Sequence, residues 1–405
     1  MSHKSLSDYF AGVAIKRLSS VETNPEKSNQ HEINGVAKLQ RLLGFDKKKL
    51  KATFLYLSDS ESPISTSGMV TWYDAREAHP TRTEYRLYYP SNEVMEYASK
   101  GDLLVIGKRP NESLVLLVVE EGSTIESQVL WLFGEEQISE IFTIHDFVSE
   151  PGRKLDFVAK MILEQIGIDI TETDEKYLDI LLKRFGNKFP PTKEFSQLAR
   201  EMTDVEMPYN PDEAILKWMN QEEILFRTFE QHFVNEKIRE GFPDVDVFIQ
   251  TALSVINRRK SRAGLALENH LEQILLDYKI SYSRGERTER RSKPDFLFPN
   301  ICVYRKQRFP NHLLTMLGVK TTCKDRWRQV LVEADRIKEK HLLTLEPGIS
   351  SAQIHEMKEN KLQLVVPSSI HKTYKEINRL WLWNLEQFIE FVKEREKISN
   401  YRDYC

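Results

Sequence analysis

The chain has 405 residues, with 58 Lys or Arg against 61 Asp or Glu, so its formal net charge is −3. A hydrophobic content of 40% supports ordinary folded cores, the length predicts two or three domains of roughly 150 residues, and no apolar run approaches the ~20 residues of a membrane span. From the first residues we expect no secretory leader, and the three cysteines form neither a CxxC pair nor a zinc-binding spacing, so we expect a cytoplasmic protein.

Short apolar or alternating runs separated by turn-forming residues predict that the first third of the chain is rich in β-structure. We expect strands at 54–59, 68–73, 83–89, 102–109, 113–121 and 127–134. Two helical patterns, at 35–43 and 92–99, interrupt these strands. Many short strands with few helices indicate a small barrel or sandwich.

From residue 154 onward, apolar residues recur every three or four positions, which is typical of helices. We expect helices at 155–166, 176–185, 194–202, 212–242 and 245–280, with proline-containing breaks at 189–191 and 208–211. Strands and helices then alternate, which predicts a mixed α/β sheet domain. The expected strands are 295–299, 313–322 and 362–367, and the expected helices are 326–340 and 384–397.

The charge is distributed unevenly along the chain. Residues 251–345 hold 20 Lys or Arg and 10 Asp or Glu, a net charge of +10 (20 − 10), so the remaining residues carry −13. A basic block of this size favours a polyanionic partner such as double-stranded DNA. Considered by itself, a solvated charged face is an equally good interpretation of the block.

Three residues within this block form a pattern that predicts catalytic chemistry. Asp295 begins one expected strand and Lys320 ends the next, so we expect their side chains to lie together at one end of a sheet. Glu333 lies on the following expected helix, from which it could fold back over the same end. Two carboxylates supply oxygen ligands for Mg²⁺, and a lysine adds charge where a phosphate becomes more negative. The pattern predicts phosphodiester hydrolysis, although such matches often arise by chance.

Basic residues and carboxylates flank this pattern on the side of the preceding helix. Glu268 and Glu272 are four residues apart and share one helix face, so either could reach the metal site, and for Glu272 a solvated position is favoured. The basic run just before them consists of Arg258, Arg259, Lys260 and Arg262.

A cation–anion–cation triplet follows the expected catalytic strand. Lys324 and Arg326 can donate to guanine O6 and N7, and Asp325 can accept from cytosine N4, so the triplet suits G·C pairs. Asp325 also suits the N-cap of the expected helix, and both interpretations can hold.

The motifs NRRKSRAG, LENHLE, KPDFLFP, VKTTCKDRWRQVLVEADRIK and LVVPSSIHK resemble the nuclease domain of EcoRII-type (type IIE) restriction endonucleases. AIKRLS, the region of His31 and TRTEYR resemble, more weakly, the effector domain of the same family. The resemblance implies a B3-like DNA-binding pseudobarrel at residues 1–172, a linker at 173–188, and a PD-(D/E)XK restriction-endonuclease-like α/β domain at 189–405.

The resemblance also implies roles for particular residues. Asp295, Lys320 and Glu333 match the catalytic triad of the family, with Asp295 and Glu333 as metal ligands, and Gly318 stands where many such nucleases have a strand carboxylate. Glu268 matches an additional acidic residue of the site. Tyr304 matches a proposed nucleophile, although a metal-activated water explains the same chemistry. The implied DNA contacts are Lys324, Asp325 and Arg326 to a CC:GG segment, the basic run 258–262, and His31, Arg82, Glu84 and Arg86 in the effector domain.

Two departures from the family pattern concern DNA contacts. Met219 and Glu223 stand where the family has an arginine and an aromatic residue that receive flipped central bases. Trp218 could substitute by stacking, or it could belong to the core. Tyr85 replaces a basic residue of the effector arm.

The function implied by the resemblance is a homodimeric, Mg²⁺-dependent deoxyribonuclease that cuts a short near-palindromic site containing CC/GG. A second copy of the site would bind at the N-terminal domain and regulate cleavage, and a cytosine methyltransferase would be the functional partner. A DNA-binding regulator with an inactive nuclease fold, a repair or RNA nuclease, and an acidic protein-interaction module are the alternatives. The basic block disfavours the last of these.

Overall fold

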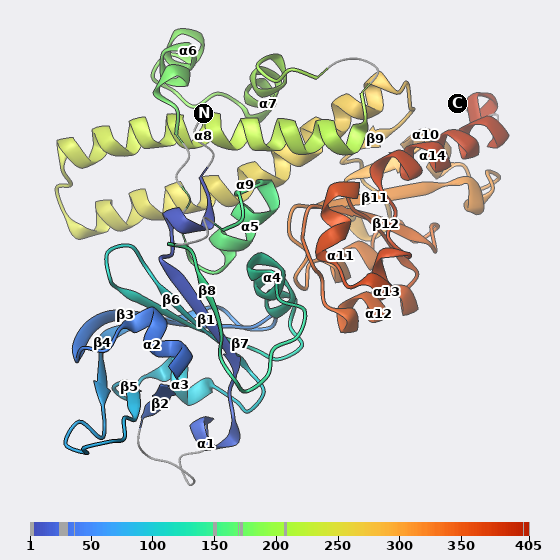
Figure 1. Cartoon of the computed structure of the whole chain (residues 1–405). Coiled ribbons are helices and arrows are strands. Elements are labelled where there is room, and N and C mark those ends of the chain that lie inside the picture. Colours follow the sequence, from blue (N-terminus) through green and yellow to red (C-terminus); the bar gives the residue numbers. More distant parts are fainter. Residues whose placement is uncertain are drawn as a thin grey trace. The chain divides into compact units, whose positions relative to one another are not determined.

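A computed structural model describes the whole chain apart from residues 1–3, 24–30, 36, 149–151, 169, 171–172, 206–208, 400 and 405. The chain divides into two compact units (Figure 1). Unit 1 comprises Met1–Asp169 and Pro347–Ala352, and unit 2 comprises Ile170–Glu346 and Gln353–Cys405. Each unit is mixed in helix and strand, and none of the helices in the described residues is long and apolar enough to cross a membrane.

Unit 1 is built on a sheet that has eight strands among its described residues, in the order β2-β5-β4-β3-β7-β6-β1-β8. Neighbouring strands are antiparallel except β3 and β7, which are parallel. The two apolar runs in β6 and β7 are almost wholly buried, as expected for strands covered on both faces. The strands are β1 Gly12–Arg17, β2 Glu32–Gly35, β3 Lys48–Leu57, β4 Ile64–Asp74, β5 Tyr85–Tyr88, β6 Leu103–Lys108, β7 Leu114–Val119 and β8 Thr143–Asp146.

Five helices accompany this sheet in the described part of unit 1, and one of them corrects a prediction. The strand expected at 127–134 was wrong, because these residues belong to a helix. Ser123 caps the helix start by accepting from the amide of Glu126, and Gly134 ends it in the left-handed conformation with φ 77°. The five-residue apolar run 129–133 alone could not distinguish helix from strand. The helices are α1 Ser20–Thr23, α2 Ala37–Leu43, α3 Glu93–Tyr97, α4 Thr124–Phe133 and α5 Phe157–Gln165.

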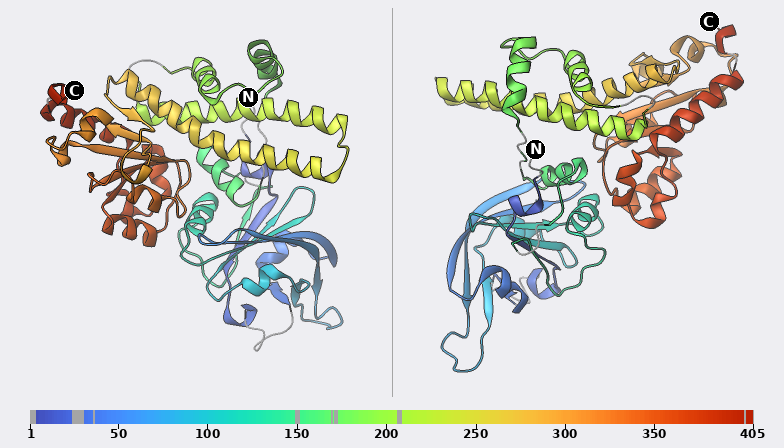
Figure 2. Two further views of the ribbon diagram at one scale, coloured as in Figure 1. Left: turned by 180° about the vertical axis from the view of Figure 1, so that it is seen from behind. Right: turned by 45° about the horizontal axis from the view of Figure 1, so that its top comes forward.

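Unit 2 begins with helices, of which two long ones lie side by side (Figure 2). Asn210 caps α8 with Pro211 in its first turn, and Gly241 ends it with φ 77°. Asp244 then caps α9 by accepting from the amide of Val247. A cluster of buried side chains that includes Phe195, Phe226 and Phe229 joins α6, α7 and α8. The bounds are α6 Glu175–Phe185, α7 Thr192–Glu201, α8 Pro211–Glu240 and α9 Val245–Asp277.

The second part of unit 2 is a sheet with the strand order β13-β12-β11-β10-β9 in the described residues. β10 is antiparallel to β9 and β11, whereas β11, β12 and β13 are parallel. The strands are β9 Ser283–Arg284, β10 Phe296–Phe298, β11 Thr315–Lys320, β12 Lys340–Thr344 and β13 Leu362–Val365. The helices are α10 Ile301–Arg305, α11 Trp327–Leu331, α12 Ser351–Glu359, α13 Glu376–Arg379 and α14 Leu385–Ser399.

The helix expected at 326–340 was mostly wrong. Only α11 forms there, because the chain turns at Ala334, whose φ is 50°, and β12 then starts at Lys340. The N-cap of α11 is Arg326 without a capping side-chain hydrogen bond, so the structure does not support Asp325 as the cap. Glu333 therefore lies after α11, in the turn that leads to β12.

Gly318 in β11 packs directly against α11. A Cβ at Gly318 would lie 2.8 Å from Cγ2 of Val330, closer than real Cβ contacts, and 3.0 Å from its Cγ1. Val330 is fully buried, so it has little room to move. The sheet position two residues before Lys320 therefore has no space for a side chain.

We expect Gly318→Ala to lower the free energy of unfolding by about 1–3 kcal/mol, because it overpacks the core. Urea unfolding measures this loss. Val330→Ala is the matched partner, and the double variant should lose less than the sum of the two single losses, because the truncation makes room for the new methyl group. Additive losses would contradict the account.

Candidate functional site

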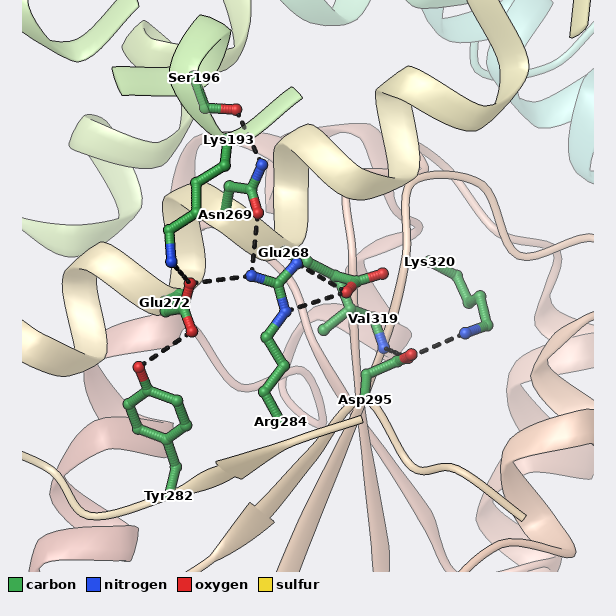
Figure 3. A network of polar contacts seen from close by, with 10 residues as sticks. All are labelled: Lys193, Ser196, Glu268, Asn269, Glu272, Tyr282, Arg284, Asp295, Val319 and Lys320. Carbon is green, nitrogen blue, oxygen red and sulfur yellow. Dashed lines mark hydrogen bonds and ion pairs between the residues drawn. The ribbon is translucent and has the colours of Figure 1, made fainter. Parts of the chain in front are cut away.

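The start of β10 and the end of β11 meet at one edge of the unit 2 sheet, because the two strands are antiparallel. There Lys320 Nζ lies 2.9 Å from Oδ2 of Asp295, and the same oxygen accepts from the amide of Val319 at 2.6 Å (Figure 3). The two side chains are 17% and 18% exposed. The adjacency expected from the spacing is confirmed, and the pair forms a half-buried, solvent-reachable ion pair.

Glu333 contributes a second carboxylate from the turn after α11. Burial raises the pKa of Glu333 to about 7, and the negative charge of Asp295 adds to this, while Lys320 and Lys340 oppose it. Its Oε2 is buried and has no hydrogen-bond partner in the described part of the chain. Glu333 thus has a buried carboxylate oxygen without a partner, and it is repelled by the charge of Asp295. A bound cation would supply the missing partner and offset the repulsion.

A third carboxylate approaches from α9. Arg284 of β9 donates to Glu268 Oε2 at 3.0 Å, to Glu272 Oε2 at 2.9 Å and to Asn269 Oδ1 at 2.9 Å. Burial raises the pKa of Glu268, and the negative charge of Asp295 raises it further, whereas the hydrogen bonds and charge of Arg284 lower it. Figure 3 shows Glu268 on the Asp295 side of Arg284 and Glu272 on the far side. Glu268 is therefore the α9 carboxylate that borders the pair, and Arg284 fixes it there.

Glu272 is engaged away from the Asp295–Lys320 pair. The hydroxyl of Tyr282 donates to its Oε1 at 3.2 Å, and Lys193 forms a 3.6 Å ion pair with its Oε2 (Figure 3). Arg284, which organises these contacts, was expected only as the first residue of the basic cluster RGERTERRSK (284–293) that precedes Asp295, without a role of its own.

The donor set at this edge fits a hard divalent cation. Mg²⁺ sites typically use one or two carboxylates and complete the shell with water and phosphate oxygens. Asp295 and the unpartnered oxygen of Glu333 meet that need. Within the described residues, no group of three or more His, Cys, Asp or Glu side chains gathers closely enough to enclose a metal ion. A cation held by these two carboxylates would take its other ligands from water and phosphate oxygens.

Tyr304 of α10 is occupied by a neighbouring carboxylate. Its hydroxyl donates to Glu289 Oε2 at 2.6 Å and accepts from the amide of Arg336 at 3.4 Å. The side chain is buried, and burial together with the Glu289 bond raises the pKa of Tyr304 above its usual value. A nucleophile needs an accessible and readily ionised oxygen. These contacts suit an anchor rather than a nucleophile.

The triplet after β11 is exposed but fixed at its base. Lys324, Asp325 and Arg326 are all exposed, and Lys324 has a left-handed φ of 40°. The preceding Cys323 is fully buried, and its amide donates to the carboxylate of Glu346. Arg326 Nη2 donates to the carbonyl and hydroxyl oxygens of Thr322 at 2.6 and 2.8 Å. The triplet therefore presents its polar side chains from a rigid turn.

The basic run on α9 is largely engaged within the helical layer. Arg258 lies over the ring of Phe189 at 4.3 Å, and Arg259 forms a 2.6 Å ion pair with Glu230. The side chain of Lys260 lies outside the described residues. Arg262 is buried and ion-paired with both Glu222 and Glu223. The structure thus brings Arg259 and Arg262 to carboxylates of α8.

Trp218 and Met219 belong to the core. They are 5% and 4% exposed, and Trp218 packs against the rings of Tyr209 and His270. This agrees with the core interpretation of Trp218 and leaves no exposed aromatic ring there for stacking.

The residues expected to contact DNA in unit 1 differ in their surroundings. Arg82 is exposed in the loop between β4 and β5. Arg86 is paired with Glu32 and, at 2.6 Å, with Glu84, which also binds Arg76. His31 has a φ of 47°, and its ring packs edge-on against Tyr89. Arg82 is therefore the most accessible cation of this group.

Comparisons with known sequences point to type II restriction enzymes. A family model described as EcoRII C terminal matches residues 226–389. The chain is 36% identical over 394 residues to the type II restriction enzyme EcoRII of Escherichia coli, covering 94% of this chain and 93% of that protein. It is 26% identical over 223 residues to the type II restriction enzyme SsoII of Shigella sonnei, covering 52% and 68%. A structure of metal-depleted Ecl18kI with uncleaved, modified DNA aligns with a TM-score of 0.43 at 19% identity, covering 55% of this chain and 84% of that one.

The raised pKa of Glu333 makes stability depend on pH. Between the ordinary value of 4.5 and about 7, the folded chain keeps a proton that the unfolded chain releases, so the free energy of unfolding falls as pH rises through this window. Glu333→Gln should therefore stabilise the protein at pH 8 by up to about 3 kcal/mol and have little effect at pH 4.5, since one pKa unit corresponds to about 1.4 kcal/mol. Chemical unfolding at both pH values in a chelator measures the difference. Equal effects at the two pH values would contradict it.

Proposed function

The chain belongs to the EcoRII family of type II restriction endonucleases, and from this premise we propose that it cuts double-stranded DNA site-specifically with Mg²⁺. The observation that carries the proposal is the Asp295–Lys320 ion pair beside the unpartnered oxygen of Glu333. Phosphodiester hydrolysis needs a cation-binding carboxylate, a positive charge next to the reacting phosphate and access for water. At this edge of the sheet, Asp295 and Glu333 offer the carboxylates, Lys320 offers the positive charge, and the partial exposure of the pair gives access for water.

The proposed mechanism assigns a separate task to each side chain. Asp295 and Glu333 would hold the cation, with Glu268 as a further carboxylate at the edge. A bound Mg²⁺ would lower the pKa of a water molecule and offset charge on the phosphate. Lys320, held in place by Asp295, orients the attacking water and stabilises the negative charge that develops on the phosphate oxygens. Tyr304 takes no chemical step, because its hydroxyl is bound to Glu289.

Sequence recognition is proposed to lie in the triplet after β11. The exposed Lys324, Asp325 and Arg326 suit the donors and acceptors of a CC:GG segment in the major groove. Because the target is near-palindromic, two copies of the chain would pair by a two-fold axis so that each cuts one strand. Buried Met219 and the ion-paired Glu223 do not offer a pocket for flipped central bases like that implied by the family.

Unit 1 is proposed to be a B3-like effector domain within residues 1–172 that binds a second copy of the site and regulates cleavage. Its strand-rich sheet and the exposed Arg82 are consistent with that role. Residues 173–188 would link it to the nuclease domain at 189–405. The family resemblance further suggests a cytoplasmic enzyme that works alongside a cytosine methyltransferase protecting the host sites.

We expect Lys320→Ala to lower the cleavage rate of unmethylated plasmid in Mg²⁺ by at least about 100-fold, because the charge next to the phosphate is lost. DNA binding in a metal-free buffer should remain. Lys397→Ala on α14 is a matched control, because this exposed lysine has no proposed role. A Lys320→Ala protein that cuts like the control would exclude the mechanism. A wild-type protein that binds without cutting would favour a DNA-binding regulator.

The two effector arginines should behave differently when they are replaced. Arg82→Ala should lower the slope of log affinity against log salt by about 0.9, as expected for one lost phosphate contact. Arg86→Ala should mainly lower the melting temperature, because Glu32 and Glu84 both lose their ion pair with Arg86. Filter binding of a duplex over a salt series and thermal unfolding separate the two outcomes. Equal salt slopes for both variants would contradict the distinction.

A further inference from the structure

We infer that residues 285–293, here called the arginine loop, grip the DNA phosphate backbone next to the cleavage site. The inference rests on the proposed function for the identity of the polyanion. The loop connects β9 to Asp295, and its charged side chains are four cations and two carboxylates, a net of +2 (4 − 2). The cations, Arg287, Arg290, Arg291 and Lys293, are all exposed.

The exposed charge is available to a ligand. Of the two loop carboxylates, Glu289 binds the buried hydroxyl of Tyr304 at 2.6 Å. Arg290 forms a 3.3 Å ion pair with Asp335, in which the two side chains are 74% and 39% exposed. Surface pairs with this exposure contribute little and exchange readily for a stronger partner. A phosphate diester can therefore replace Asp335 at Arg290 at little cost.

Two adjacent arginines of the loop adopt a backbone conformation that favours glycine. Arg290 has φ 53° and ψ 24°, and Arg291 has φ 62°. This left-handed region costs free energy for any residue with a Cβ. Thr288 and Ser292 hold the turn closed, since the amide of Thr288 donates to the carbonyl of Ser292 at 2.9 Å. Glycine would fit both positions without strain, so the turn itself does not explain the arginine side chains, whereas ligand binding does.

The loop is tied to both catalytic segments. The amide of Gly285 donates to the carbonyl of Asp295 at 3.1 Å, which joins the loop base to the first catalytic carboxylate. Through Glu289 the loop also contacts Tyr304, whose hydroxyl accepts from the amide of Arg336 in the turn that follows Glu333. The Arg336 guanidinium in turn donates to the carbonyl oxygens of Tyr304 and, at 2.8 Å, of Phe309.

These ties give Tyr304 a positioning role. A phosphate held by the arginine loop sits at a fixed position relative to Asp295 and the Glu333 turn, and such positioning aids a reaction by orienting its substrate. Removing the Tyr304 hydroxyl would release Glu289 and loosen the loop. The turn after Glu333 would still be held, because the Arg336 guanidinium keeps its bonds to the carbonyl oxygens of Tyr304 and Phe309. The expected effect falls on substrate binding rather than on the chemical step.

The test is a double variant, Arg290→Gly with Arg291→Gly, in the full-length chain. It removes two charges and relieves the backbone strain, so its melting temperature should equal or exceed that of the wild type. Lys361→Gly is the matched control, because Lys361 is also an exposed cation with a left-handed φ, 55°. It lies just before β13, at the opposite end of the parallel strands from Lys320.

The first measurement is binding of a duplex of about 30 base pairs in a metal-free buffer over a salt series, where each lost phosphate contact lowers the salt slope by about 0.9. The double variant should bind more weakly and lose about 1.8 from the slope, whereas the control should match the wild type. The second measurement is plasmid cleavage, in which the double variant and Tyr304→Phe should raise KM several-fold with a much smaller change in kcat. A large fall in kcat for Tyr304→Phe would instead support a nucleophile.

The inference is overturned if the double variant has the affinity, salt slope and KM of the Lys361→Gly control. Its failure can be told apart from failure of the proposed function, because binding is measured without divalent metal. If Lys320→Ala abolishes cutting and the glycine variant binds like the wild type, only the arginine loop is excluded. If the wild type never cuts and the glycine variant loses affinity, the nuclease proposal fails and the loop remains a DNA-binding element.

Discussion

The candidate site depends on the antiparallel pairing of β10 with β11. The register that places Phe296 opposite Leu317 brings Asp295 beside the end of β11, where Lys320 reaches it. The same strand has no room for a carboxylate at Gly318, because Val330 fills the space where a side chain would begin. The second carboxylate must therefore come from outside the sheet, and Glu333 supplies it from the turn after α11.

The carboxylates near this pair are buried close to one another, and this has energetic consequences. Burial and the charge of Asp295 raise the pKa of both Glu268 and Glu333. Keeping these groups together without a metal therefore lowers the free energy of unfolding when they are ionised. Arg284 offsets part of the cost at Glu268, whereas Oε2 of Glu333 has no such partner in the described part of the chain. A cation that binds only the folded state would recover that free energy as added stability.

The sequence predicted the strands that carry Asp295 and Lys320, because two apolar runs with a fixed spacing leave few ways to pair. It misassigned α4, since five consecutive apolar residues suit a buried strand or helix equally well and only the cap at Ser123 decides. It missed the turn at Ala334 and so placed Glu333 on a helix. The partners of Arg262 and Tyr304 lie on distant segments, and no local pattern reveals them. The functional domain boundaries and the DNA contacts remain predictions.

The most direct measurement of the central claim is digestion of a plasmid of known sequence by the wild-type protein in Mg²⁺, followed by sequencing of the ends. The account predicts cuts on both strands at one discrete, near-palindromic sequence containing CC/GG, absent when Mg²⁺ is withheld or when the cytosines of the site are methylated. Random nicking, or binding with no cleavage in Mg²⁺, would contradict it.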